Sequence, residues 1–202
     1  MATLQRKKNK FYRSREHLTY EEVTALATAA GRRGRHPLRD QAIIWLSFRH
    51  GLRAGEAANL KWQSVTGWDT LFIQRLKGSS SGAHTLKPDE VEMLRDLRSR
   101  YPDSPYLFPN ERGGAITPAA IGKMITRAAE LAGLNIDVHP HMLRHACGYD
   151  LANQGIDTRM IQEWLGHVNI QHTSRYTAIA PLRFQSLPWK EFQPVPLDDC
   201  NL

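Results

Sequence analysis

The spacing of apolar side chains predicts helices over much of the chain. Apolar residues recur at helical intervals or in apolar-rich blocks, and residues that favour helix boundaries flank these segments. Thr19 followed by Glu22 has the form of a capping box, and Pro118 after Thr117 suits a first helical turn. The predicted helices cover residues 19–30, 38–50, 89–100 and 117–131.

One segment has the spacing of a strand instead. Leu71, Ile73 and Arg75 alternate with the residues between them, which is the pattern of a strand with one buried face. A G-S-S-S-G turn at residues 78–82 follows, so residues 68–87 are predicted to form a hairpin. The expected fold class is therefore α+β, mainly α with a small antiparallel β-sheet.

A polar stretch between residues 139 and 177 carries the candidate chemistry. Pro140 suits the first turn of a helix, on which His141 and Arg144, three residues apart, share one face. Arg144 offers a planar fork of N–H donors that matches phosphate oxygens, and His141 adds a further donor. This pair is expected to converge on one anionic ligand.

Two more reactive side chains follow a second predicted helix. The run D-T-R-M-I-Q-E-W-L is expected to form a short helix that Asp157 caps and Gly166 ends. His167 then lies in the turn that leaves this helix, and Tyr176 follows on another short helix. Any one of these residues alone is typical of ordinary packing, but together they supply cations for a phosphate and a nucleophile.

The upstream motif G-L-R-A-G-E contributes a second arginine. Arg53 is expected to open a helix, with Glu56 on the same face. Because a carboxylate cannot bind phosphate, the role expected of Glu56 is to hold Arg53 through a charge-assisted hydrogen bond. The alternative is an ordinary ion pair on the protein surface.

Composition narrows the class of partner. The chain of 202 residues has 27 Lys and Arg against 20 Asp and Glu, a formal net charge of +7, which favours a polyanion such as nucleic acid. Cys147 and Cys200 lie in no metal-ligand spacing and indicate a reducing compartment without disulfides. No apolar run approaches the length of a membrane span, and the N-terminus lacks the apolar region of a signal peptide. A soluble, intracellular protein is expected.

The H-x-x-R, L-G-H and tyrosine elements, in this order, resemble the C-terminal signature of the tyrosine recombinases, the integrase family. G-L-R-x-x-E resembles the motif of that family's first catalytic arginine, and the resemblance spans nearly the whole chain. It implies the catalytic-domain fold of the family. H-P-H-M-L-R-H-A-C-G, G-I-D-T-R and R-L-K-G are similar to the short invertases of fimbrial phase variation. The implied catalytic residues are Arg53, Lys77, His141, Arg144, His167 and Tyr176.

The sequence has no carboxylate cluster of the kind that holds two metal ions, so a reaction without metal ion or cofactor is expected. The resemblance implies the steps of that reaction. Tyr176 would attack a DNA phosphate to give a 3′-phosphotyrosine, while the arginines and histidines offset charge in the transition state. Lys77, at the start of the hairpin tip, would protonate the departing 5′-oxygen. For the proton of Tyr176, His141 is the first candidate acceptor and water the second. The alternatives to Lys77 along the hairpin are Arg75, His84 and Lys87.

We expect three segments: a basic arm over residues 1–17, a catalytic domain over 18–180, and a proline-rich apolar tail over 181–202. Relatives commonly carry a separate DNA-clamping domain before the catalytic domain, and only the basic arm stands in that position. The tail is expected to pack on its own domain or on a neighbouring copy.

The expected function is site-specific DNA recombination, inverting a promoter-bearing segment to control fimbrial or surface-structure phase variation. The expected partners are double-stranded DNA with inverted repeats, other copies of the chain in a tetramer on paired sites, and DNA-bending accessory proteins. The expected location is the bacterial cytoplasm, at the nucleoid. Three alternatives remain: an integrase or excisionase of a mobile element, a relaxing topoisomerase, and a DNA-binding regulator without catalysis.

Overall fold

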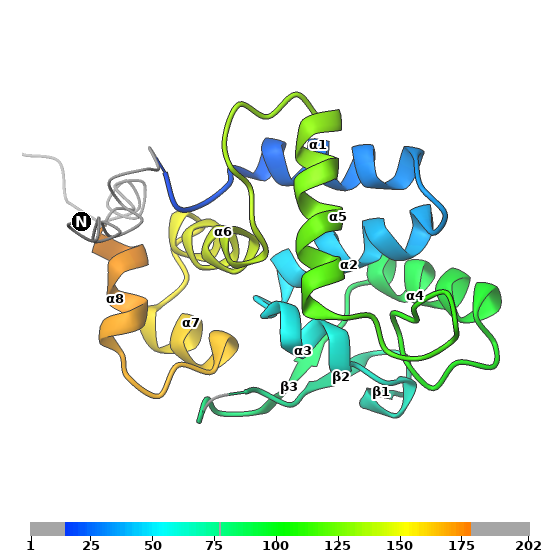
Figure 1. Ribbon diagram of the computed structural model, residues 1–202. Coiled ribbons are helices and arrows are strands. Elements are labelled where there is room, and N and C mark those ends of the chain that lie inside the picture. The colour runs from blue at the N-terminus through cyan, green and yellow to red at the C-terminus, as the bar shows by residue number, and fades with distance from the viewer. Residues whose placement is uncertain (1–14, 77, 179–202) are drawn as a thin grey trace, which may run out of the picture.

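The computed structural model describes residues 15–76 and 78–178 (Figure 1). Most of the predicted arm, Lys77 and the predicted tail lie outside the described residues. Within these residues the fold is mainly helical with a small antiparallel sheet, which confirms the predicted class. The α-helices are α1 (Tyr20–Arg32), α2 (Pro37–Arg49), α3 (Ala54–Asn59), α4 (Pro88–Arg100), α5 (Pro118–Leu131), α6 (Pro140–Asn153), α7 (Thr158–Leu165) and α8 (Gln171–Ala178).

Local capping contacts explain where the helices begin. Thr19 Oγ1 accepts the amide hydrogen of Glu22 at 3.3 Å, and the Glu22 carboxylate accepts that of Thr19 at 2.8 Å. Thr117 caps α5 through the amide of Ala120, at 3.1 Å. The predicted capping box and the predicted start of α5 are therefore confirmed.

The chain is already packed before α1. Arg15 forms an ion pair with Glu22, and the rings of His17 and Tyr149 lie 4.0 Å apart between centroids. Leu18 is buried in the core. The last residues of the predicted arm, Arg15 and His17, therefore contact the folded domain.

The sheet contains the predicted hairpin and one short additional strand. Strands β1 (Val65–Thr66), β2 (Thr70–Ile73) and β3 (Gly82–Thr85) are antiparallel in the order β1-β2-β3. Leu71 and Ile73 are buried while Phe72 is exposed, so the predicted alternation is confirmed. A short 3₁₀ helix, η2 (Trp62–Ser64), precedes β1.

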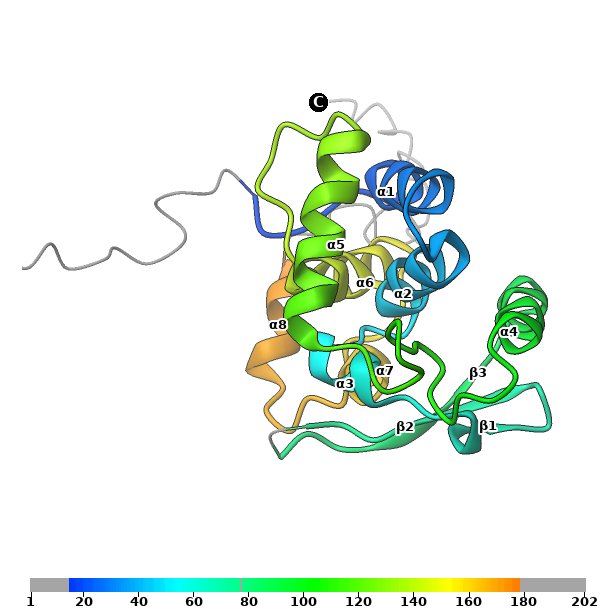
Figure 2. The ribbon, with the colours of Figure 1, turned by 45° about the vertical axis from the view of Figure 1, so that its right-hand side comes forward.

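The hydrophobic core lies among α1, α2, α5 and α6. Figures 1 and 2 show α1 beside α2, α5 running across them, and the sheet at the far edge of the molecule near α4. Ile43, Ile44 and Leu46 of α2 are completely buried between these helices. Burial of each such side chain stabilises the fold by about 2 kcal/mol. No helix in the described ranges is long and apolar enough to cross a membrane.

The last three helices bring the motif residues to one end of the molecule. Asp157 caps α7 through the amide of Arg159, and Gly166 ends it at a φ of 69°, in the left-handed region that favours glycine. The chain then turns into α8, which packs against α6. Residues 139–177 therefore fold back on themselves beside α3 and the tip of the hairpin (Figure 1).

Candidate active site

Arg144, on the first turns of α6, is fixed from two sides. Its guanidinium donates to the backbone oxygens of Gly51, at 2.5 Å, and Leu165, at 2.7 Å, and its side chain is buried. Burial, followed by the nearby charges of Arg53 and Arg75, lowers the Arg144 pKa to about 10. Arg144 therefore remains a cation at neutral pH and is held rigidly.

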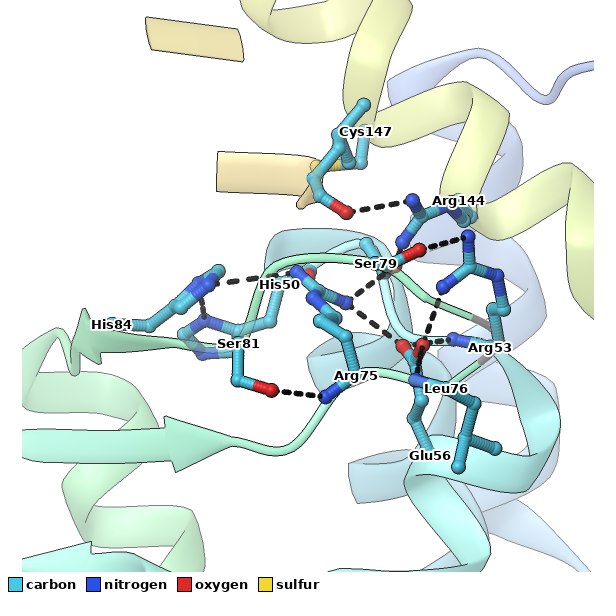
Figure 3. Close-up of polar contacts among 12 residues, drawn as sticks. His50, Arg53, Glu56, Arg75, Leu76, Ser79, Ser81, His84, Arg144 and Cys147 are labelled. Atoms are coloured by element: carbon cyan, nitrogen blue, oxygen red, sulfur yellow. Dashed lines mark hydrogen bonds and ion pairs between the residues drawn. The ribbon is translucent and has the colours of Figure 1, made fainter. Parts of the chain in front are cut away.

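Arg53 occupies the position just before α3, and the Glu56 carboxylate holds it as predicted. The Glu56 carboxylate accepts hydrogen bonds from the Arg53 side chain, at 2.6 Å, and from its backbone amide, at 3.0 Å. The carboxylate is buried, whereas the Arg53 side chain keeps a quarter of its surface exposed. The alternative of an ordinary surface pair is wrong, because the arginine is oriented by a buried partner (Figure 3).

Two histidines flank the arginines as neutral groups. Desolvation, followed by the charge of Arg144, lowers the pKa of His141 to about 4 and that of His167 to about 3. His141 has an exposed edge, yet enough protein surrounds its ring to disfavour the charged form. His167 Nδ1 lies 2.8 Å from Thr173 Oγ1. When that hydroxyl donates to Nδ1, the remaining ring N–H is free to donate to a phosphate oxygen.

Tyr176 lies on α8 with its ring buried against α6. A Cβ atom on Gly148 would lie 2.6 Å from the Tyr176 ring, so only glycine at that position leaves room for the ring. The phenol oxygen lies 3.0 Å from His145 Nδ1. Burial raises the pKa of Tyr176 to about 12, so the phenol is protonated at neutral pH.

His145, rather than His141, is the side chain in contact with the Tyr176 hydroxyl. His141 packs edge-on against the His145 ring, with 4.4 Å between centroids. From the sequence, only the first histidine of H-M-L-R-H was expected to take part in the chemistry. The available signal was spacing, because His145 lies one helical turn after His141 and adjacent to Arg144.

The hairpin tip contacts both arginine sites. Arg53 donates to Ser79 Oγ at 3.0 Å, and the Ser80 amide donates to the Gly166 oxygen at 3.1 Å. The Leu76 amide donates to Glu56 at 3.2 Å. Lys77 lies outside the described residues, but chain on either side of it contacts the site.

Two of the three alternatives to Lys77, Arg75 and His84, are buried and engaged elsewhere, whereas the Lys87 side chain is exposed. The Arg75 guanidinium is buried and ion-paired with Glu56 at 2.9 Å. His84 is buried against Trp164, and desolvation lowers its pKa to about 3. The backbone amide of Lys87 caps α4 by donating to Glu90, at 2.8 Å. Arg75 and His84 thus have no open path to a phosphate bound at Arg53. No group of three potential metal ligands occurs among the described residues.

Comparisons with known proteins show which family the chain matches. Residues 16–183 match the phage integrase family. The chain is 38% identical to the type 1 fimbriae regulatory protein FimB of Escherichia coli K12, over 87% of this chain and 90% of FimB. It is 39% identical to FimE of the same strain, over 86% of this chain and 90% of FimE. Tyrosine recombinase XerA of Pyrococcus horikoshii is 32% identical, over 80% of this chain and 56% of XerA.

Solved structures show the same fold. A crystal structure of XerA recombinase superposes with a TM-score of 0.73 at 27% identity, over 84% of this chain and 62% of that one. XerH recombinase bound to palindromic difH substrate gives a TM-score of 0.71 at 29% identity, over 84% of this chain and 51% of XerH. The chain thus spans less than two thirds of each of these recombinases.

The chain belongs to the phage integrase family. Its fold is that of a tyrosine recombinase catalytic domain, and it is a site-specific tyrosine recombinase.

Proposed function

We propose that this recombinase cuts and rejoins DNA through Tyr176 and thereby inverts a promoter-bearing segment that controls fimbriae or another surface structure. The observation that supports catalysis is the anchoring of two guanidinium groups next to each other, Arg53 by Glu56 at 2.6 Å and Arg144 by the Gly51 oxygen at 2.5 Å. After burial, the charge of Arg53 is the largest cause that lowers the Arg144 pKa. Such a pair repels itself unless an anion lies between its members. Inversion is supported by similarity to FimB and FimE over 90% of their lengths.

The proposed chemistry begins with attack of the Tyr176 oxygen on phosphorus. The bond from phosphorus to the 5′-oxygen breaks, leaving the DNA 3′-phosphate esterified to Tyr176. Arg53 and Arg144 offset the charge that develops on the phosphoryl oxygens, and His141 and His167 donate hydrogen bonds as neutral groups. Attack by a 5′-hydroxyl of the partner strand reverses the step without ATP, because the phosphotyrosine ester retains the bond energy. No metal ion takes part in this scheme.

Two proton transfers complete the scheme. A phenol with a pKa of about 12 needs a proton acceptor. His145 is the acceptor that the 3.0 Å contact with the hydroxyl supports, in place of His141. Its pKa of about 3 in the free protein makes it a weak base, so the negative charge of the bound phosphate has to raise that pKa before it can accept the proton. Lys77 is the proposed donor to the departing 5′-oxygen, because Leu76 on one side of it contacts Glu56 and Ser79 on the other contacts Arg53.

The proposed partners follow from an inversion reaction. Double-stranded DNA with inverted repeats would bind one copy of the protein at each half-site, since a palindrome and a two-fold dimer share symmetry. The palindromic substrate of XerH, a 29% identical relative, supports this arrangement. Four copies would join paired sites, DNA-bending proteins would bring those sites together, and the reaction would occur at the nucleoid in the bacterial cytoplasm.

The direct test is incubation of the protein with the genomic fragments that flank its gene. Sequencing across each fragment should reveal a segment in both orientations, bounded by inverted repeats. Excised circles instead would identify an integrase or excisionase, and changes in supercoiling alone would identify a topoisomerase. Altered promoter output without any rearranged DNA would identify a regulator without catalysis.

Tyr176→Phe tests the assignment of the nucleophile. The variant should bind the same DNA within about twofold, because only one oxygen is removed, yet form no covalent adduct on a nicked substrate that traps the intermediate. Gel electrophoresis under denaturing conditions measures the adduct. Adduct formation by Tyr176→Phe at the wild-type level would show that another residue attacks.

A further inference from the structure

Arg75 occupies an unusual position for a hairpin residue. It follows β2, and its side chain is almost fully buried beneath the candidate active site. A buried cation is costly unless every donor finds a partner. The Arg75 guanidinium donates to Glu56 at 2.9 Å and to the backbone oxygens of Gly51 at 3.1 Å, His50 at 2.9 Å and Trp164 at 2.6 Å.

Two of these acceptors are shared with the candidate phosphate-binding arginines. Glu56 receives Arg75 on one carboxylate oxygen and the Arg53 side chain on the other (Figure 3). The Gly51 oxygen receives both Arg75 and Arg144, the latter at 2.5 Å. Arg75 therefore contacts the immediate support of Arg53 and of Arg144, without lying beside the open face of the site itself.

The third acceptor lies at the end of α7. Trp164 precedes Leu165, whose oxygen accepts the second hydrogen bond from Arg144. Gly166, the glycine of L-G-H, packs against the aliphatic part of the Arg75 side chain. A Cβ on Gly166 would lie 3.0 Å from Arg75 Cγ and 2.4 Å from the Ser80 backbone oxygen. One planar guanidinium thus joins the hairpin, the α2–α3 connection, α3 and the end of α7.

We propose that Arg75 is a positioning residue for recombination, which sets the geometry of Arg53 and Arg144 through the Glu56 carboxylate and the Gly51 carbonyl they share. The inference rests on the proposed function. Arg75 does not touch the phosphate, so its effect is transmitted entirely by the two arginines. Lysine cannot replace it, because one ammonium group cannot reach four acceptors spread around a planar fork.

The test compares wild type with Arg75→Lys in single-turnover cleavage of a nicked substrate. We expect Arg75→Lys to bind DNA within about threefold of wild type and to cleave about a hundredfold more slowly, because the donors of Arg53 and Arg144 are displaced from the geometry that the transition state requires. The matched control is Arg39→Lys, which alters another buried arginine, paired with Asp40 and the Pro109 oxygen away from this site. Arg39→Lys should cleave at the wild-type rate.

A second substrate separates positioning from general damage to the fold. In a methylphosphonate a methyl group replaces one phosphoryl oxygen, so less charge develops for the arginines to offset. The deficit of Arg75→Lys should shrink to about tenfold or less on this substrate. An equal deficit on both substrates would overturn the proposal, as would wild-type cleavage by Arg75→Lys. A deficit that shrinks only when sulfur replaces the 5′-oxygen would also overturn it, because that result places the effect on the leaving group.

Two controls complete the design. Circular dichroism and thermal unfolding establish that Arg75→Lys is folded. Should it fail to fold, Arg75→Gln takes its place, since the amide still donates hydrogen bonds and introduces no unpaired buried charge. Absence of any adduct with wild-type protein on its verified target would overturn the proposed function itself, and this inference with it.

Discussion

The Glu56 carboxylate resolves an apparent conflict at the site, because an acidic side chain is buried where an anionic substrate is proposed to bind. Burial raises its pKa, but hydrogen bonds from Arg53 and ion pairing with Arg75 outweigh burial, and the net pKa is lowered. The ionised carboxylate thus pairs with two cations and is itself fully buried, while a quarter of the Arg53 side chain stays exposed. It fixes the arginines without cancelling the charge they present.

A single substitution, His145→Gln, tests the proton acceptor proposed for Tyr176. Loss of a positioned base should slow single-turnover cleavage by about a hundredfold at pH 7, with DNA binding preserved. Between pH 7 and 9 the variant should regain activity relative to wild type, because hydroxide increasingly takes over as the acceptor. His36→Gln, which changes a histidine bonded to Tyr101 instead, is the control and should match wild type. A constant ratio of rates across this pH range would assign His145 a packing role.

Residue roles were predictable from the sequence where partners are neighbours in the chain. Arg53 and Glu56 share one helical turn, so their spacing alone predicted the ion pair. The contacts of Arg75 reach residues 24 and 89 positions away, and no local pattern encodes such distances. The alternation of the hairpin placed Arg75 in register with Leu71 and Ile73, but the sequence treated it as an alternative to Lys77 and did not indicate that Glu56 and backbone oxygens would surround it.

Among the secondary-structure elements, the hairpin is the one whose tip would have to move when DNA binds in the proposed complex. Ser79 contacts Arg53 where a phosphate oxygen would bind in the proposed complex, and the Ser80 amide is held by Gly166. The strands themselves are anchored by buried Leu71 and Ile73. The hairpin therefore has a fixed base and a tip whose few polar contacts a phosphate can replace.

Lys77→Ala tests the role proposed for this tip. If Lys77 protonates the 5′-oxygen, the variant should cleave ordinary DNA about a hundredfold or more slowly. A substrate with sulfur at the bridging 5′ position should restore most of the rate, since a thiolate leaves without a proton. Cleavage assays on the two substrates give the ratio directly. Equal defects on oxygen and sulfur substrates would remove Lys77 from the proton transfer.

Helix boundaries were more predictable than the short strand elements. Thr19, Thr117 and Asp157 cap their helices through side-chain contacts within three residues, so sequence alone placed those starts. β1 has only two residues, Val65 and Thr66, too few to display any periodicity. It exists because β2 offers it a partner, which is a tertiary effect.

At the scale of the whole molecule, the cationic site affects stability as well as chemistry. The pKa of His84 is lowered to about 3 and that of His145 to about 3, by desolvation first and then by neighbouring histidines and arginines, which disfavour a further positive charge. His141 and His167 are shifted in the same direction. The folded protein therefore keeps several histidines neutral at pH values where the unfolded chain protonates them.

This difference predicts that acid destabilises the protein well above the pH at which carboxylates titrate. From the ordinary histidine value of 6.5 downwards, the unfolded chain binds more protons than the folded protein, so the free energy of unfolding must fall as pH falls. The pKa values of Glu56 and Glu90 are lowered from 4.5 in the folded protein, so the stability that these ionised carboxylates contribute is lost only as the pH falls below about 4.5. Urea unfolding at intervals between pH 7 and 5 should show a steady decline. The decline should be shallower in His84→Gln, which removes one of the histidines that the folded protein keeps neutral. A free energy of unfolding that does not change with pH in the wild type would show that these histidines are not held neutral.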